Sequence, residues 1–165
     1  MINKYSHSLP YYIIFFTIIF HLIFINLSPI NFENSFSEGA KYLNDYNIKI
    51  IDSFFEHNAN TFVFSLISSI FHKILPFIDT LYITKFISLL GYLFLGIGII
   101  NIHKLFNLKI NLSLLILIIF FNPIIWTYGY RGTPDFISSS LAFFSLSYLL
   151  NEKNEIKKIF LCSLI

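Results

Sequence analysis

Four long, nearly uncharged apolar runs make up almost half of this 165-residue sequence. They lie at residues 11–27, 81–102, 110–126 and 135–150. A helix that spans a bilayer needs about 20 mostly apolar residues. Only 12% of the residues are charged, whereas about 25% are charged in an ordinary soluble domain. We therefore predict an all-α, polytopic integral membrane protein with about four transmembrane helices.

The segment at residues 31–60 differs from these runs, because it carries five carboxylates against two lysines. We interpret it as an extramembrane loop. Apolar residues recur within it at helical spacing, at Phe36, Ala40, Leu43 and Tyr46. This spacing predicts a short amphipathic helix on the membrane surface.

Residues 61–75 are apolar but are interrupted by three serines, and Pro76 follows them. A helix of this length extends about 22 Å, which is less than the apolar core of a bilayer. The segment therefore predicts an interfacial or re-entrant helix rather than a span. We expect its serines to face protein or water.

Lysine placement predicts the orientation in the membrane. If the chain crosses once between residues 60 and 103, one side of the membrane holds Lys4, Lys104, Lys109, Lys153, Lys157 and Lys158. The acidic loop and Arg131 then lie on the other side. Because short cytoplasmic loops are enriched in lysine and arginine, we expect a cytoplasmic N-terminus and an external loop at residues 31–60.

The last seven residues, from Ile159, begin a further apolar run. Seven residues cannot cross a core about 30 Å thick. We therefore expect the chain to be a piece of a longer protein, truncated at the start of another span.

Composition excludes several kinds of site. The net charge of +2 is small and dispersed, which does not indicate a nucleic-acid partner. Cys162 is the only cysteine, so the chain has no internal disulfide and no cysteine-based metal site. The histidines lack metal-ligand spacing. We expect His21 to form hydrogen bonds within the helix bundle, with a proton relay as the alternative.

Arg131 and Asp135 flank a tight Gly-Thr-Pro connection at the predicted membrane boundary. Ionisable groups at that depth are costly unless they are paired or functional. Two interpretations stay open here: a functional site, or a helix cap with a local ion pair.

Four motifs follow one another along the chain. They are residues 32–43 with Glu33; residues 57–62 with 71–73; residues 84–91; and Asn122–Pro123 followed by Tyr128, Tyr130, Arg131 and Asp135. This order resembles the GT-C superfamily of membrane glycosyltransferases, of the aminoarabinose-transferase and protein O-mannosyltransferase type. The resemblance implies that residues 1–165 are the N-terminal part of one GT-C-like transmembrane domain, in the bacterial inner membrane.

The resemblance also implies a reaction and its residues. A sugar would pass from a polyprenyl-phosphate donor to a hydroxyl acceptor at the outer face, with Glu33 and Asp135 as catalytic carboxylates. Three cations would bind the donor phosphate: Arg131, Lys73 and Lys85. A divalent cation held by the two carboxylates stays an open alternative.

Two other classes of protein remain alternatives to the enzyme. A small non-catalytic membrane subunit would account directly for the short chain. A transporter fragment would use His21 and the glycines at residues 91, 96 and 98 for ion passage and helix packing. No inverted repeat is visible in the sequence, which counts against the transporter.

Overall fold

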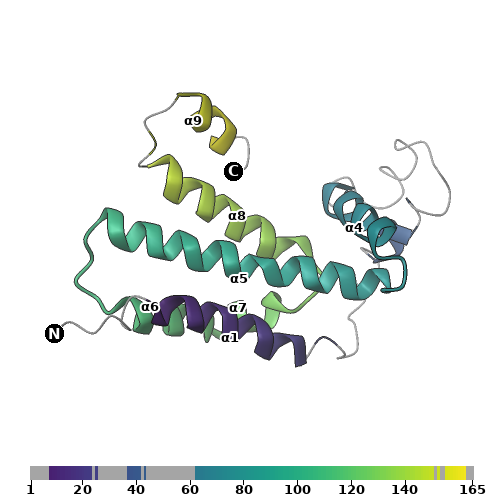
Figure 1. The fold of residues 1–165 in the computed structure, drawn as a ribbon, viewed down its shortest axis with the longest axis horizontal. Coiled ribbons are helices and arrows are strands. Elements are labelled where there is room, and N and C mark those ends of the chain that lie inside the picture. The colour runs from purple at the N-terminus through teal and green to yellow at the C-terminus, as the bar shows by residue number, and fades with distance from the viewer. Residues whose placement is uncertain are drawn as a thin grey trace.

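The computed structural model describes residues 8–23, 25, 37–41, 43, 62–150, 152 and 155–162. All regular secondary structure in these ranges is helical, which confirms the all-α prediction. The longest helix, α5 (Thr80–Leu105), runs through the middle of the bundle, with α8 (Pro134–Leu149) along one side of it. The helices α1 (Leu9–Ile23), α6 (Leu112–Phe120) and α7 (Pro123–Gly129) lie along the other side (Figure 1).

Local sequence accounts for the length of α5. Asp79 caps its N-terminus, and the Asp79 carboxylate accepts a hydrogen bond of 2.9 Å from the Leu81 N–H. The 26 residues extend about 39 Å, a few residues beyond the predicted span at 81–102. Within the described part of the chain, α5 is the one helix that by itself is long and apolar enough to cross a membrane.

The predicted span at residues 110–126 is a broken helix. Asn111 caps α6, Asn122 caps α7, and the two helices are bent by 68°. Pro123 has no N–H to donate, and its fixed φ suits the first residue of a helix, so a new helix starts there. The break between α6 and α7 therefore lies at the Asn122–Pro123 pair. Taken as one bent span, α6 and α7 together are long and apolar enough to cross a membrane.

The other two predicted spans form helices that are shorter than a bilayer core. α1 has 15 residues and α8 has 16, which extend about 22 and 24 Å. The apolar core of a bilayer is about 30 Å thick. Helix length therefore does not confirm the prediction of four transmembrane helices.

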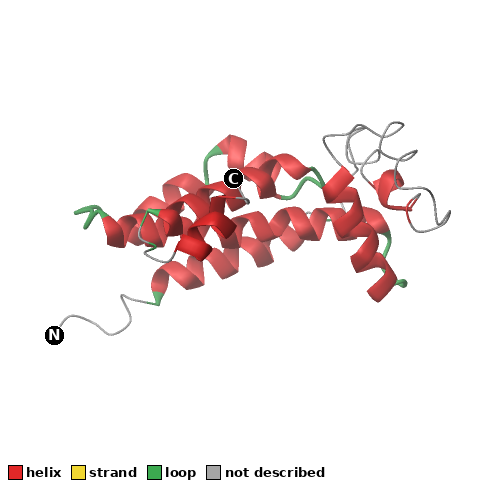
Figure 2. Cartoon of the chain, turned by 90° about the horizontal axis from the view of Figure 1, so that it is seen from above, coloured by secondary structure: helices red, strands yellow, loops and turns green. Residues whose placement is uncertain are grey.

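Residues 61–75, predicted as a non-spanning helix, form α4 (Phe62–Ile74), which has 13 residues. It crosses the N-terminal end of α5 rather than running along it (Figures 1 and 2). Its serines, Ser65, Ser68 and Ser69, are buried against protein, as expected. Whether α4 lies in a membrane interface stays a prediction.

The loop predicted at residues 31–60 lies outside the described residues, except for 37–41 and 43. These six residues are helical, in agreement with part of the predicted amphipathic helix. The Ser37 and Thr80 hydroxyls form a hydrogen bond of 2.7 Å, which joins this segment to the start of α5.

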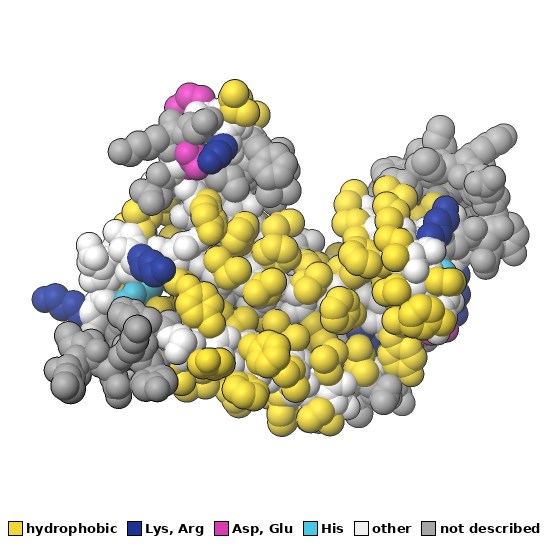
Figure 3. Space-filling view, viewed as in Figure 1, with side chains coloured by type: hydrophobic (Ala, Val, Ile, Leu, Met, Phe, Trp, Pro, Cys, Tyr) yellow, Lys and Arg dark blue, Asp and Glu magenta, His cyan; other side chains and the backbone are white. Residues whose placement is uncertain are grey.

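Many polar side chains face the interior of the bundle, and large apolar side chains cover its exterior. The interior holds Thr17 and His21 of α1, Thr84 and Ser88 of α5, and Ser140 and Ser145 of α8. Exposed apolar residues include Phe15, Phe16, Leu93, Ile118 and Leu146. Figure 3 shows hydrophobic side chains over the middle of one face, with most of the lysine and arginine side chains toward its ends.

The described turns group at two ends of the bundle. One end joins the start of α1, the end of α5 and the start of α6, where Leu9, His103 and Asn111 line one cavity. The end of α8 lies there too, since the Asn101 amide donates to the Ser147 hydroxyl at 3.4 Å. Lys104 and Lys109 therefore share one end, as lysine placement predicts. Which side of a membrane that end faces stays a prediction.

Candidate functional site

The connection between α7 and α8, residues 130–133, lies against the first turns of α5. Gly132 makes the closest approach: a Cβ added there would lie 2.7 Å from the Thr84 Oγ1 and 3.3 Å from the Lys85 Cγ. Any larger residue at this position would push the connection away from α5. The missing side chain of Gly132 therefore brings the segment around Arg131 next to Lys85.

Lys85 is the most unusual residue at this end, because its side chain is only 1% exposed within an apolar helix. Its Nζ donates a hydrogen bond of 2.8 Å to the backbone carbonyl of Ile25, just beyond α1. A buried ammonium group is costly unless other groups replace its hydration. Lys85 therefore ties the chain beyond α1 to α5, in addition to the phosphate-binding role predicted for it.

Arg131 is half-buried, and its guanidinium carbon lies 5.0 Å from the centre of the Tyr130 ring. This distance is within the range of a cation–π interaction, which limits the directions that the guanidinium samples. Arg131 and Lys85 thus place two cations at the same end of the bundle, from two different segments of the chain.

Asp135 lies in the first turn of α8, where the helix dipole favours a carboxylate. Its side chain is exposed and lines a groove of about 530 Å³ with Ile124, Tyr128 and Phe136. The structure therefore places Asp135 in an open, mainly apolar groove.

A second groove, of about 320 Å³, lies between α4, α5 and α8. Its lining is almost entirely apolar and includes Phe64, Ile87 and Pro134. Pro134 and Asp135 are adjacent in sequence, so the two grooves lie on neighbouring sides of the start of α8. The start of α8 therefore borders two grooves: one that is almost entirely apolar and one that contains the Asp135 carboxylate.

Two predicted site residues remain, Glu33 and Lys73. Glu33 lies outside the described residues. Lys73 is exposed in the last turn of α4. At the N-terminus of α5, the Lys41 Nζ forms an ion pair with the Asp79 Oδ2 at 3.3 Å. The described part of the site thus comprises Lys85, Arg131 and Asp135 at one end of the bundle.

Asp79, the residue that caps α5, has a shifted pKa. The hydrogen bond from the Leu81 N–H holds the pKa of the Asp79 carboxyl below its usual range, and Lys41 acts in the same direction. Partial burial opposes this effect. Asp79 is therefore a helix cap and an ion-pair partner.

A polar chain in the middle of the bundle links three helices. The Tyr92 hydroxyl of α5 lies 3.0 Å from the His21 Nε2 and donates to the Ile125 carbonyl, also at 3.0 Å. The His21 Nδ1 lies 2.8 Å from the Thr17 carbonyl. Because a carbonyl only accepts, we assign the ring proton to Nδ1. The prediction that His21 forms hydrogen bonds within the bundle is confirmed.

The sequence reasoning missed Tyr92. The available signal was a tyrosine in the middle of an apolar run, directly after Gly91. With a neutral His21, two acceptors compete for the single hydroxyl proton of Tyr92: the His21 Nε2 and the Ile125 carbonyl. This polar chain lies at the level of α7, just after the break between α6 and α7.

No group of three or more His, Cys, Asp or Glu side chains suited to a metal ion occurs among the described residues. Since Glu33 is not among them, the alternative of a cation shared by Glu33 and Asp135 is not tested. The chain matches no protein-family model, no curated protein and no solved structure.

Proposed function

We propose that this chain is a membrane-embedded glycosyltransferase of the GT-C type. It transfers a sugar from a polyprenyl-phosphate donor to a hydroxyl acceptor at the outer face of the membrane. The observation that carries the proposal is the start of α8, where an apolar groove and a groove with a carboxylate lie side by side. Lys85 and Arg131 lie at the same end of the bundle.

The distribution of side chains supports placement in a membrane. Serine, threonine and glycine pack between the helices, and phenylalanine, isoleucine and leucine cover the exterior. In a bilayer, small residues allow helices to approach closely, and polar side chains form hydrogen bonds between helices. The length of α5 and the combined length of α6 and α7 agree with this environment.

An amphiphilic donor needs an apolar path for its lipid and a cation for its phosphate. The groove between α4, α5 and α8 offers the apolar path. Arg131 and Lys85 supply the positive charge, which would stabilise the phosphate as it leaves. In this assignment Pro134 lies beside the lipid and Asp135 faces the acceptor.

The chemistry requires one proton transfer and one displacement. The Asp135 carboxylate removes the proton from the acceptor hydroxyl, and the resulting oxygen attacks the anomeric carbon of the sugar. The bond between that carbon and the phosphate oxygen breaks, and its electron pair leaves with the lipid phosphate. The displacement inverts the anomeric carbon. Glu33 is the second carboxylate proposed for this site.

The test uses the full chain in membrane vesicles, with radiolabelled polyprenyl-phosphate mannose and polyprenyl-phosphate aminoarabinose as donor probes. Asp135→Asn should lower sugar transfer by about 100-fold or more, because a general base is lost. Asp79→Asn is the matched control: it changes a carboxylate at the same end that lies outside both grooves. Transfer by Asp135→Asn at the control rate would contradict the assignment, as would the absence of transfer by the unmodified chain.

One observation favours a transporter as the second candidate. The break of 68° between α6 and α7 lies beside the polar chain of His21 and Tyr92, and discontinuous helices next to polar groups are typical of transporters. Proton uptake into vesicles that contain the chain, lost in Tyr92→Phe, together with no sugar transfer would favour this candidate.

A further inference from the structure

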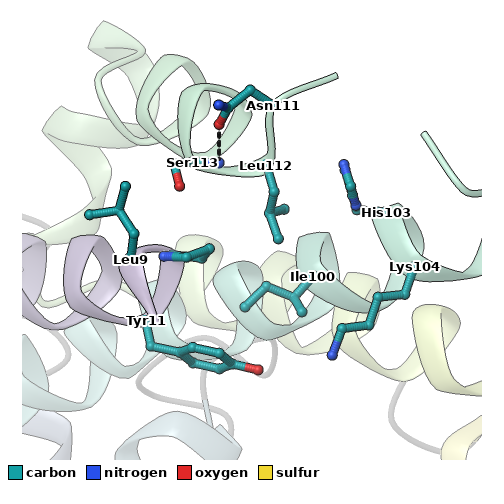
Figure 4. Close-up of a pocket in the computed structure, with 9 residues that line it drawn as sticks. Leu9, Tyr11, Ile100, His103, Lys104, Asn111, Leu112 and Ser113 are labelled. Atoms are coloured by element: carbon teal, nitrogen blue, oxygen red, sulfur yellow. Dashed lines mark hydrogen bonds between the residues drawn. The ribbon is translucent and has the colours of Figure 1, made fainter. Parts of the chain in front are cut away.

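A cavity of about 520 Å³ lies at the opposite end of the bundle from Asp135, where α1 begins, α5 ends and α6 begins. Leu9, Ile100 and Leu112 form its apolar wall, one residue from each helix (Figure 4). The polar part of the lining comes from Tyr11, Asn111 and the end of α5. In Figure 4 the Lys104 side chain extends from α5 in the direction of Tyr11.

The charged side chain that lines this cavity is positive. Lys104 contributes a positive charge, and the described residues that line the cavity include no aspartate or glutamate. The His103 Nε2 lies 2.8 Å from the Ile110 carbonyl, so that ring nitrogen is engaged with the backbone. The N-terminal ends of α1 and α6 also border the cavity, and the positive ends of their two dipoles outnumber the one negative end, that of α5. The cavity therefore favours an anion, with Lys104 as its cation.

The apolar surroundings indicate what kind of anion would fit. Leu9 and Tyr11 are about half exposed, and Tyr12, Ile110 and Leu114 beside them are exposed as well. The cavity thus opens beside the apolar exterior of the bundle. Tyrosines at such a position are typical of the boundary between lipid tails and headgroups. A soluble anion would leave this apolar wall uncovered, whereas an amphiphile would cover it.

We infer that this cavity binds the headgroup of an anionic phospholipid, with its phosphate at Lys104 and its acyl chains against Leu9 and Leu112. Basic pockets between membrane helices recognise such headgroups. The inference rests on the membrane placement in the proposed function and does not depend on sugar transfer. Its test reads lipid binding alone, so its failure is distinguishable from failure of the enzyme assignment.

The test uses the purified full chain in phosphatidylcholine nanodiscs, titrated with a fluorescent phosphatidylglycerol. Lys104→Gln should weaken phosphatidylglycerol binding by about fivefold, the effect expected for one lysine near an anionic headgroup. Lys104→Arg should retain binding. Lys109→Gln is the matched control, because Lys109 is an exposed lysine at the same end that does not line the cavity. It should bind like the unmodified chain.

Competition separates the two sources of a phosphate group. Unlabelled phosphatidylglycerol should displace the probe, whereas glycerol 3-phosphate should not, because it lacks the acyl chains. Equal losses in Lys104→Gln and Lys109→Gln would overturn the inference, since they would indicate diffuse attraction to the basic end. Displacement by glycerol 3-phosphate at equal concentration would overturn it as well, in favour of a soluble anion.

Discussion

The interior and the exterior of the helix bundle differ from the distribution typical of a soluble protein, because polar side chains are frequent inside and large apolar side chains are frequent outside. On α1, Thr17 and His21 are buried, whereas the neighbouring Phe16 is 62% exposed. On α4 the serines face protein, and Ile74 is 67% exposed. The apolar core around Leu89, Tyr92 and Phe120 is mixed with glycine, serine and threonine rather than separated from them.

This difference indicates which contacts hold the bundle together. Between helices in a bilayer, burial of apolar surface contributes little, because lipid tails are as apolar as leucine. Close packing at small residues and hydrogen bonds between helices then carry more of the stability. The interior should therefore be sensitive to the smallest additions, and the exterior should tolerate large deletions.

The largest expected effect is at Gly129. An added Cβ would lie 2.2 Å from the Tyr92 Oη and 2.3 Å from its ring, which is completely buried. Gly129→Ala should lower the free energy of unfolding by about 3 kcal/mol, the upper range for an overpacked core. Phe16→Ala, on the exterior, should change it by about 0.5 kcal/mol or less. Unfolding in detergent micelles by a denaturant series measures both.

A double variant separates the clash at Gly129 from a backbone effect. In a Tyr92→Ala background the ring is gone, so Gly129→Ala should cost much less than it does alone. Additive losses in the double variant would contradict the clash. A larger loss from Phe16→Ala than from Gly129→Ala would overturn the comparison between interior and exterior.

A smaller loss in the free energy of unfolding is expected from a change at Tyr92 itself. Tyr92→Phe keeps the ring but removes the hydroxyl that contacts the His21 Nε2 and the Ile125 carbonyl. We expect a loss of about 1–2 kcal/mol, because the single hydroxyl proton for which these two acceptors compete is lost. Tyr82→Phe is the matched control, since Tyr82 lies on the same helix and is exposed. Equal thermal unfolding of the two variants would show that the hydrogen bonds contribute little.

The smallest effect is expected at the polar end, where the Asp79 side chain is about half exposed. Asp79→Ala should cost about 1 kcal/mol through the lost helix cap. The pKa of Asp79 is lower in the folded protein than in the unfolded chain, mainly because of the Leu81 N–H. Its charge-dependent stabilisation is thus present at neutral pH and is lost as the pH falls through the folded pKa.

Asp79→Asn tests the direction of this pH dependence of stability, because asparagine caps a helix but does not titrate. Between about pH 5 and 3, the unmodified chain should lose more stability than Asp79→Asn does. Thermal unfolding across this range measures the difference. Parallel pH profiles for the two proteins would exclude a contribution from the carboxylate charge.

Features that depend on neighbours along the chain follow from local sequence. Asp79, Asn111 and Asn122 each cap a helix through backbone groups two or three residues away. Pro123 places the break between α6 and α7 for an equally local reason. Lys104 and Lys109 lie at one end because the first ends α5 and the second belongs to the short connection from α5 to α6.

Contacts between helices set which side of each helix faces inward and which side chains meet. His21 and Tyr92 are 71 residues apart in the chain, and the Lys85 Nζ and the Ile25 carbonyl are 60 residues apart. Whether α1 and α8 cross a membrane did not follow from their apolar runs either, since both helices are shorter than a bilayer core. The two grooves at the start of α8 depend on α4 and α7, whose directions no local pattern encodes. Which side chains of a helix are buried depends on the neighbouring helices that pack against it, so the sequence of one apolar helix does not specify its buried side.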